Sequence, residues 1–405
     1  MVLHDIKTNQ AICVIDPTAQ LIKIIIDYIP KEHLDRVVYF NTSMPVPLDF
    51  FSYKDDDEKQ DLITDISNII DLSTAPIAKN YLRKIINALF EANSNPKIFD
   101  PQKGIDHRYT FFDIPRIVLD EAFRNRLLSY CPLQRQYDFP PHIKLQSDSI
   151  TAIVIRLSQL TDSSVMKTIL GTKDPRLNIS DLINGNKIFL VDLKETESDQ
   201  IIGSIIAAKI QHAIFARRHL LDIRKCKPYC LYIDECDVIL KFAESRFTAI
   251  LGRARKYNLF MTMANPIPAD LPEGIQKALG KIGNLVIFNL DEADARVFKA
   301  KILPYRTDSF VNLPSFRALF RTNNKVHLIR TPTSLPSRVS SNADYVRKRT
   351  LDLYACNTSP ISHNEFHGKP DPDDPNQARS APDTRGVFRA PKHGRGTASP
   401  KADPD

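Results

Sequence analysis

The sequence is poor in several residue types and patterns, and each shortage excludes a class of protein. Its 405 residues contain no tryptophan, 12 glycines and only six cysteines. Six scattered cysteines in so long a chain argue against a secreted domain held together by disulfides. Apolar runs such as residues 21–26 and 201–206 fall far short of the roughly 18 residues that a membrane span needs. No basic-then-apolar leader with a small-residue cleavage site occurs at the start, so we expect a cytoplasmic protein without a membrane segment.

The remaining composition is that of a folded protein with a tail of different character. Hydrophobic residues make up 42% and charged residues 25% of the chain, enough for two or three domains of roughly 100–200 residues. Residues 357–405 hold eight of the 28 prolines and almost no aliphatic side chains. Such a segment cannot bury enough apolar surface to offset the entropy of ordering, which predicts a disordered tail, either passive or partner-binding. Its charges balance, so the net charge of +7 lies on the preceding residues.

Short apolar runs bounded by polar residues or proline predict buried strands. Six such runs occur, in residues 11–15, 36–40, 187–193, 229–233, 259–264 and 285–290. Several lack polar alternation, as strands covered on both faces of a parallel sheet do. Helical patterns such as residues 204–220 and 237–257 lie between them, and this alternation predicts a doubly wound, mostly parallel α/β core. Residues 317–321 and 325–330 flank Thr-Asn-Asn and predict a terminal hairpin.

Residues 61–160 have a different pattern. Apolar residues recur at helical spacing in residues 81–92 and 117–129, and strand signals are sparse. We interpret this region as a helical insertion, with Pro140-Pro141 marking a loop within it. The core then comprises residues 1–60 and 161–335, and an extension over residues 336–356 leads into the tail.

The strongest local signal is an apolar strand that ends in two acids. Residues 229–235 read Tyr-Cys-Leu-Tyr-Ile-Asp-Glu, which places Asp234 and Glu235 at the carboxyl edge of the sheet, where open α/β folds bind ligands. In nucleotide hydrolases the first such acid helps to hold Mg²⁺ and the second orients the attacking water. The alternative is that the pair caps the following helix, whose dipole favours acids at its start.

The usual companion of such a pair, a phosphate-binding loop, does not occur in the sequence. The pattern Gly-x4-Gly-Lys-Ser/Thr supplies backbone N–H groups that surround phosphates. Its nearest approximation is Gly274-x5-Gly280-Lys281-Ile282, which has one residue too many, lacks the hydroxyl and follows the Asp-Glu strand instead of preceding it.

Further candidates flank the next strand. Asn265 follows residues 259–264 and is either a sensor of a γ-phosphate or a turn residue before Pro266. Arg253 and Arg255 precede that strand and are either arginine fingers reaching across a subunit boundary or a solvated basic helix end.

Two other groups have weaker signals. A basic stretch within residues 217–227 is either a nucleic-acid contact or a solvated loop. Cys226, Cys230 and Cys236 have irregular spacing for zinc, and we expect packing thiols.

Taken in order, these segments resemble the hexameric DNA-pumping ATPases. That group includes the HerA-like translocases and the TraG/TraD-type coupling proteins of conjugative type IV secretion. The segments that carry the resemblance are residues 11–17, 29–40, 184–193, 231–235, 252–259, 263–265 and 313–318. They span most of residues 10–335, and the ordered set is more specific than any one motif.

The resemblance implies a RecA-like fold and a ring that couples ATP hydrolysis to DNA movement. Asp234 would hold Mg²⁺ through water, and Glu235 would position the attacking water. Asn265 would sense phosphate and Arg253 or Arg255 would act on a neighbouring subunit, while Asp16, from the Ile-Asp-Pro segment, joins Asp234 as a cofactor-binding residue. DNA, other copies of the chain and type IV secretion components are the implied partners, at the inner face of the membrane.

Departures from the family pattern limit this expectation. Thr18-Ala19-Gln20 stands where the family has His-Gly-Asp, and Pro266 stands where it has Gln. In the family the phosphate loop lies just before the Ile-Asp-Pro strand, where this sequence begins. We therefore expect a core that lacks its first strand and does not hydrolyse ATP alone, with another chain supplying the missing half. The alternative is a non-catalytic remnant that binds DNA or a partner.

Overall fold

The structure is a computed structural model, and most of its first 355 residues are described. Those residues are 1–44, 46–70, 72–139, 147–161, 164–194, 196–219, 226–240, 244–279, 282–299, 308–322, 325–334 and 342–355. They belong to one compact unit, Met1–Ile361. The predicted loop at Pro140-Pro141 and the predicted disordered tail lie outside the described residues.

Five parallel strands form the central sheet, in the order β2-β5-β1-β6-β7. Their bounds are Ala11–Asp16 (β1), Val37–Asn41 (β2), Ile188–Asp192 (β5), Tyr229–Ile233 (β6) and Leu259–Met263 (β7). Every residue of β1, β5 and β6 is buried, which matches their unbroken apolar sequences. The predicted doubly wound parallel core is therefore confirmed.

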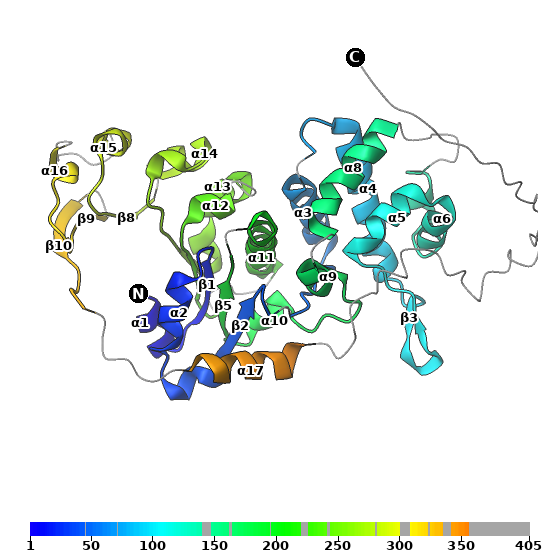
Figure 1. Cartoon of the computed structure of the whole chain (residues 1–405), viewed down its shortest axis with the longest axis horizontal. Coiled ribbons are helices and arrows are strands. Elements are labelled where there is room, and N and C mark those ends of the chain that lie inside the picture. The colour runs from blue at the N-terminus through cyan, green and yellow to red at the C-terminus, as the bar shows by residue number, and fades with distance from the viewer. Residues whose placement is uncertain are drawn as a thin grey trace, which may run out of the picture. The chain divides into compact units, whose positions relative to one another are not determined.

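Alternate residues of each strand enter two different apolar clusters, because side chains alternate across a strand. Ile12 and Val14 pack with helices α1 (Val2–Lys7) and α2 (Gln20–Ile26) on one face. Cys13 and Ile15 belong to the cluster on the other face, which includes most of α11. Helices thus cover both faces of the sheet, as Figure 1 shows.

Helix α11 (Glu197–Phe215) is the central helix of the molecule. Thr196 caps its start by accepting the N–H of Asp199 at 3.2 Å. Asp199 and every residue from Ile201 to Ile214 are buried, because the sheet lies on one side and helix α3 on the other. No helix among the described residues is long and apolar enough to cross a bilayer.

The region predicted as a helical insertion is indeed helical, and α3 starts at Asp56. Its helices are α3 (Asp56–Ile69), α4 (Pro76–Asn93), α5 (Ile114–Leu119), α6 (Glu121–Ser129), α7 (Leu133–Gln136), α8 (Ser147–Thr161) and α9 (Ser164–Gly171). A two-residue ladder, β3 (Phe99–Asp100) with β4 (Ile105–Asp106), lies among them. Helix α10 (Ile179–Asn184) then leads into β5.

Buried polar side chains of α11 bond to the segment just before the insertion and to helix α3. Lys209 donates to the carbonyl oxygens of Phe50 and Ser52 at 3.1 and 2.8 Å. His212 Nε2 lies 2.7 Å from Asp65 Oδ2 on α3. Burial lowers the pKa of Lys209, whose ammonium is satisfied by carbonyl groups inside the protein.

A second, antiparallel sheet has the order β10-β9-β8, with bounds Asn284–Ile287 (β8), Arg317–Thr322 (β9) and Lys325–Arg330 (β10). The predicted hairpin is confirmed as β9 and β10. The expectation that residues 285–290 form a strand of the parallel core is wrong, because β8 pairs with β9. Its burial alternates between exposed and covered positions, as in a sheet that is not sandwiched between helices.

The predicted helix over residues 237–257 is interrupted. The structure has α12 (Cys236–Leu240), α13 (Glu244–Leu251) and a short 3₁₀ helix (Ala254–Tyr257), which ends at Asn258 in the left-handed conformation, φ 55°. The remaining helices are α14 (Glu273–Leu279), α15 (Glu292–Lys299), α16 (Asp308–Val311) and α17 (Ala343–Tyr354). Helix α14 packs on α13, and α17 packs on β2.

Candidate functional site

Three neighbouring strands of the sheet end in carboxylates. Asp16 closes β1 and is the register partner of Asp192, which closes β5. Asp234 follows β6, whose last residue, Ile233, pairs with Ile15 of β1. Because the strands are parallel, the three carboxylates lie at one edge of the sheet, where such folds bind ligands.

Asp16 is fully buried and holds the turn between β1 and α2. Its Oδ1 accepts the backbone N–H and the hydroxyl of Thr18, each at 3.0 Å, and its Oδ2 accepts the N–H of Ile22 at 2.9 Å. Ala19, between them, has φ 61°, a left-handed conformation that costs energy for a residue with a side chain. These bonds give Asp16 a local structural task, and its role toward a cofactor stays a prediction.

Asp192 was not singled out from the sequence, and the structure places it in a buried polar group. Its Oδ2 accepts a hydrogen bond from the hydroxyl of Tyr39 and another, 2.7 Å long, from Asn41 Nδ2. Its Oδ1 is buried without a hydrogen-bond partner among the described residues. Burial raises the pKa of Asp192 despite those two bonds, and the charge of Asp16 adds to the rise. Burial and the bond to Asp192 raise the pKa of Tyr39 to about 12.

The one sequence signal for Asp192 was positional. It closes an apolar strand as Asp16 does, within the segment 184–193 that carries part of the resemblance, but it has no adjacent acid. Its partners Tyr39 and Asn41 come from β2, some 150 positions earlier in the chain. Only the pairing of β2 with β5 brings them together.

Asp234 and Glu235 form a strained turn directly after β6. The N–H of Asp234 donates to the carbonyl oxygen of Ile15 at 3.0 Å, and Asp234 Oδ1 accepts the N–H of Glu235 at 3.2 Å. Glu235 has φ 40°, a conformation that residues with side chains adopt mainly where the surroundings enforce it. Burial raises the pKa of Asp234, and the nearby charge of Asp16 raises it further. The two acids are half-buried and keep contact with solvent.

Asn265 ties the end of β7 to the helix after this turn. Its Oδ1 accepts the N–H of Asp237 in α12 at 3.2 Å, and its Nδ2 donates to the carbonyl oxygen of Ile267 at 2.6 Å. Asn265 thus caps α12. From the sequence, Asp234 and Glu235 were the candidates for capping this helix. The structure brings Asn265 to the same sheet edge as these acids, and its role as a phosphate sensor stays a prediction.

Arg253 and Arg255 lie at the amino ends of the strands, opposite the ends that carry the carboxylates. They belong to the segment before β7, and the parallel arrangement puts that segment at the amino ends of the strands. Both side chains are exposed. The structure therefore does not bring them to the carboxylates of their own chain.

The basic stretch and the cysteines have mainly structural positions. Arg217 is buried and donates to the carbonyl oxygen of Tyr257 at 2.9 Å, and burial lowers its pKa. Lys227 is exposed, and Arg224 and Lys225 lie outside the described residues. Cys230 and Cys236 are buried free thiols. In the described ranges no three His, Cys, Asp or Glu residues are grouped to hold a metal ion.

The residues at this end of the sheet suit the Mg²⁺ ion of a nucleotide complex but not its triphosphate. Carboxylate oxygens such as those of Asp234 are the ligands that Mg²⁺ takes from proteins, together with water. A triphosphate requires a row of backbone N–H donors as well, and glycine-rich turns supply it. None of the five core strands is followed by a glycine-rich turn in the sequence.

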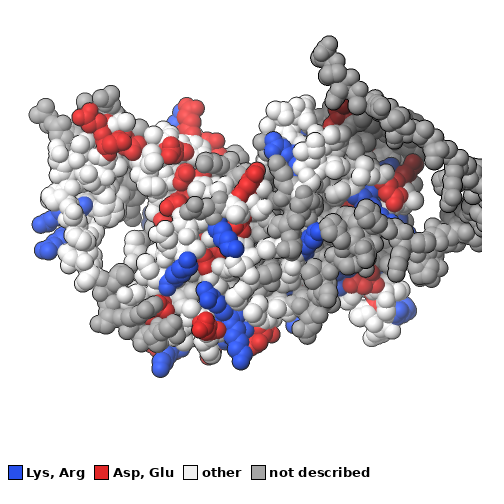
Figure 2. Space-filling model, in the orientation of Figure 1, with Lys and Arg blue, Asp and Glu red and all other residues white. Residues whose placement is uncertain are grey.

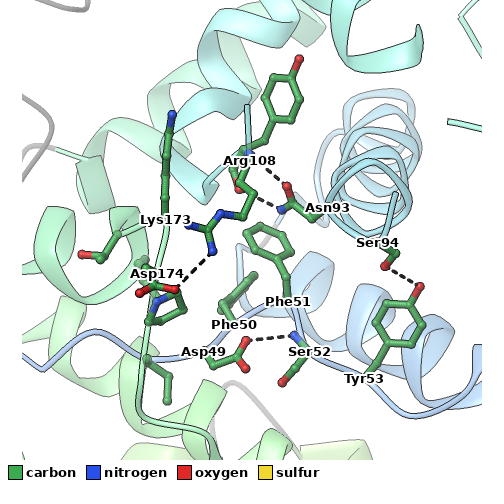
Figure 3. Close-up of a pocket in the computed structure, with 15 residues that line it drawn as sticks. Asp49, Phe50, Phe51, Ser52, Tyr53, Asn93, Ser94, Arg108, Lys173 and Asp174 are labelled. Carbon is green, nitrogen blue, oxygen red and sulfur yellow. Dashed lines mark hydrogen bonds and ion pairs between the residues drawn. The ribbon is translucent and has the colours of Figure 1, made fainter. Parts of the chain in front are cut away.

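A hollow of about 480 Å³ is lined by residues 48–53, by 170 and 172–175, and by Asn93, Ser94, Arg108 and Tyr109 of the insertion, and none of the strand-end carboxylates lines it. Figure 3 shows Arg108 reaching across it toward Asp174, at 3.3 Å. The same guanidinium pairs with Asp106 at 2.9 Å, and Asn93 exchanges hydrogen bonds with the backbone of Tyr109. The pair of Arg108 with Asp174 joins the insertion to residues 170–175, and the other bonds lie within the insertion.

Comparisons with known proteins place the fold. No family model matches the sequence, and no curated protein sequence matches it. The structure is similar to the bacterial conjugative coupling protein TrwBΔN70, with a TM-score of 0.60 and 13% identity over 83% of this chain and 81% of that one. It is also similar to TrwB in complex with ADP and Mg²⁺ (TM-score 0.59, 13% identity, 84% and 82% covered) and to VirB4 of Thermoanaerobacter pseudethanolicus (0.53, 14%, 82% and 84%). This chain therefore has the RecA-like α/β fold of the conjugative coupling proteins.

Proposed function

We propose that the chain is the core of a ring-forming, ATP-dependent DNA translocase of the conjugative coupling type. The observation that carries the proposal is the position of Asp234 and Glu235. They follow a buried strand at the carboxyl edge of a RecA-like sheet, beside Asp16 on the neighbouring strand. Acids at that position serve nucleotide hydrolysis in folds of this kind.

In this proposal each polar residue of the edge has a separate role. Asp234 holds Mg²⁺ through a water molecule, and Mg²⁺ when bound neutralises charge on the phosphates. Glu235 orients the attacking water, and the enforced φ of 40° fixes its backbone for that task. Asn265, tied to α12 by its amide, responds to the terminal phosphate.

The exposed arginines support an assembly of several copies. Arg253 and Arg255 lie at the amino ends of the strands, away from the carboxylates of their own chain. Only a neighbouring subunit can therefore bring such arginines to the carboxylates. A closed ring, hexameric in our proposal, gives every site one such neighbour. DNA in the pore and other secretion components are the further partners that we propose.

We propose that the residues of this sequence do not hydrolyse ATP alone, because no phosphate-binding loop pattern occurs among them. A single preorganised donor in a hydrolytic site is worth about 3 kcal/mol, and here the whole phosphate-binding loop is absent from the sequence. The second candidate is a binding protein without catalysis. It is favoured by the full use of Asp16 and Asn265 in local hydrogen bonds.

Metal binding separates the two candidates. We expect Mn²⁺, used as a paramagnetic substitute for Mg²⁺, to bind the full chain, and Asp234→Asn to weaken that binding at least about tenfold. Glu121→Gln, an exposed acid in the first turn of α6, is the matched control and should leave binding unchanged. Equal metal affinity in Asp234→Asn and the unaltered chain would favour the binding protein. Micromolar ATP affinity without a partner would contradict the incomplete site.

DNA binding is tested by its salt dependence. On the face in Figure 2, acidic side chains gather around α13–α15 and basic ones are interspersed with acids near α17, so the described residues on this face form no continuous basic surface. A translocase holds DNA through phosphate contacts, and we expect affinity for labelled duplex to fall by at least about tenfold between roughly 50 and 200 mM salt. An affinity that stays constant over this range would exclude phosphate-driven contact.

A further inference from the structure

The hollow of about 480 Å³ lies where the helical insertion joins the core. The chain enters the insertion just after residues 48–53 and leaves it at residues 170–175, and residues from both segments line the hollow. A main-chain bond ties the two connections together, because Leu48 donates its N–H to the carbonyl oxygen of Ile169 at 3.0 Å. The volume falls within the roughly 300–1,000 Å³ that small-molecule sites occupy.

Aromatic rings form one wall of the hollow. Phe50 is buried, and Phe51 and Tyr53 are half-buried. The ring of Phe51 lies edge-to-face against Phe50, with 5.1 Å between the ring centroids, and against Phe90 at 5.2 Å. Phe90 also contacts the ring of Tyr53, at 5.6 Å. Because these contacts fix the rings in place, the wall is already formed for a flat apolar group.

The carboxylate of Asp49, which also lines the hollow, is held by the protein itself. Its Oδ1 accepts the N–H of Ser52 at 3.1 Å, and its Oδ2 accepts a hydrogen bond from Asn178 Nδ2 at 2.9 Å. Its charge also raises the pKa of the buried Lys209 ammonium, against the lowering by burial. A cationic ligand would therefore have to compete with these groups for Asp49.

Arg108 and Lys173 are the cations of the hollow, and they differ in how firmly they are held. Arg108 makes two bonds to Asp106, at 3.0 and 2.9 Å, and one longer bond to Asp174, at 3.3 Å. Lys173 is exposed, makes no ion pair within the described part of the chain and donates to the carbonyl oxygen of Asp106 at 3.3 Å. Figure 3 shows Lys173 and Asp174 on one side of Arg108. The positive charge of Lys173 at this rim suits an anion.

We propose that this hollow binds a small aromatic carboxylate. The flat apolar body of the ligand lies against the rings of Phe51 and Tyr53. Its carboxylate takes the place of Asp174 on the guanidinium of Arg108 and pairs with the ammonium of Lys173. The side chain of Asp174 is 66% exposed, so its bond to Arg108 is weak and its displacement into water costs little.

The wall and the rim together select this class of ligand. An inorganic anion would bond to the cations but leave the aromatic wall uncovered, and a cationic ring would find Asp49 and Asp174 already bonded. The unpaired charge of Lys173 balances a single negative charge. The strand-end carboxylates do not line the hollow, so this inference does not depend on the proposed nucleotide site. Because an occupant contacts the insertion and both of its connections, Tm should rise with ligand concentration.

The fluorescent aromatic carboxylate 2-naphthoate tests the proposal directly. The chain has no tryptophan, so the fluorescence of the probe is read against a low background. We expect saturable binding to the full chain, and slower amide exchange in residues 48–53 and 172–175 should locate the bound probe. The control is 2-naphthamide, which has the same rings without the charge and should bind at least about tenfold more weakly, since it loses the charge-assisted bonds. Equal affinity for the two compounds, or binding that does not saturate, would overturn the proposal.

Two substitutions at the exposed rim should change the affinity in opposite directions. Lys173→Gln removes the unpaired cation and should weaken binding of 2-naphthoate about fivefold. Asp174→Asn removes the carboxylate that competes for Arg108 and should strengthen binding about threefold. Lys97→Gln, at an exposed position of the insertion that does not line the hollow, is the matched control and should leave the affinity unchanged. Weaker binding by Asp174→Asn, or unchanged binding by Lys173→Gln, would overturn the proposal.

Discussion

The two edges of the central sheet differ in what completes them. At β2, helix α17 lies over the strand, Val346 is fully buried and the Thr350 hydroxyl accepts the N–H of Tyr39. At β7 no further described strand pairs with the outer side, and Phe260 is half-exposed. One edge is thus closed by residues some 310 positions away in the same chain, and the other is open.

The three strand-end carboxylates lie between these two edge strands. β5, which ends in Asp192, is next to the covered strand β2, and β6, which precedes Asp234, is next to the open strand β7. Asp16 and Asp192 are held by internal hydrogen bonds. Of the three carboxylates, Asp234 therefore lies closest in strand order to the open side, where Asn265 bonds to α12.

Removing the cover of β2 should have the largest effect. Val346→Asp places a charge in a fully buried position between α17 and the sheet and should lower the free energy of unfolding by more than about 3 kcal/mol. Leu353→Asp, on the exposed side of the same helix, should cost less than about 1 kcal/mol. Urea unfolding measures both. Similar costs for the two variants would mean that α17 does not protect the β2 edge.

Proline in β7 compares the inner and outer sides of the open edge. Even-numbered residues of β7 face β6, as the bond from the N–H of Ala264 to the carbonyl of Ile233 indicates. Thr262→Pro removes a bond to β6 and should cost about 3 kcal/mol, while Met261→Pro removes an outward N–H and should cost about 1 kcal/mol. Unfolding in urea again gives both values. If Met261→Pro is as destabilising as Thr262→Pro, the outer N–H is already bonded within the chain.

Two tyrosines near the closed edge differ in burial but not in type of partner. Tyr39→Phe removes the buried bond to Asp192 and should cost about 1–3 kcal/mol. Tyr345→Phe removes an exposed bond to Asp35, 3.0 Å long, and should cost less than about 0.5 kcal/mol. The difference in urea midpoint measures the value of the buried group. Equal costs would argue against a tightly held Asp192.

Neutralising Asp234 should have the smallest effect on stability. It should raise the stability slightly while it lowers the affinity for the metal ion. Burial raises its pKa in the folded state above the ordinary 3.8, so the folded state binds the proton more tightly than the unfolded state. The free energy of unfolding therefore falls as pH rises from 3.8 through the raised pKa. Asp234→Asn should remove this dependence and raise Tm at pH 7 by about a degree, while Mn²⁺ affinity drops. A lower Tm would mean that the charge stabilises the fold.

The strands were predictable from sequence because burial on both faces leaves unbroken apolar runs. β1, β5 and β6 have such runs and lie where the sequence indicates. The membership of β8 was not predictable, since a run of Leu-Val-Ile fits either a parallel or an antiparallel partner. The helix predicted over residues 237–257 was too long, because the helical spacing of apolar residues continues past Leu251, where α13 ends.

The site was predictable where chemistry and position coincide in one segment. Asp234 and Glu235 follow a single apolar strand, and Asn265 follows the next. Asp192 was missed because its partner Tyr39 comes from β2, and Tyr39 is itself covered by Arg347 of α17. Only the folded chain brings these three residues together. Lys209 and His212 were missed for the same reason, as their partners Phe50, Ser52 and Asp65 lie about 150 positions earlier in the chain.

Amide hydrogen exchange on the full chain, resolved to single residues, tests the contrast between the two edges most directly. The account predicts that the N–H of Tyr39, bonded to Thr350 under α17, exchanges with the slow core, while those of Met261 and Met263 exchange at least about a hundredfold faster. Equal protection at β2 and β7 would contradict it.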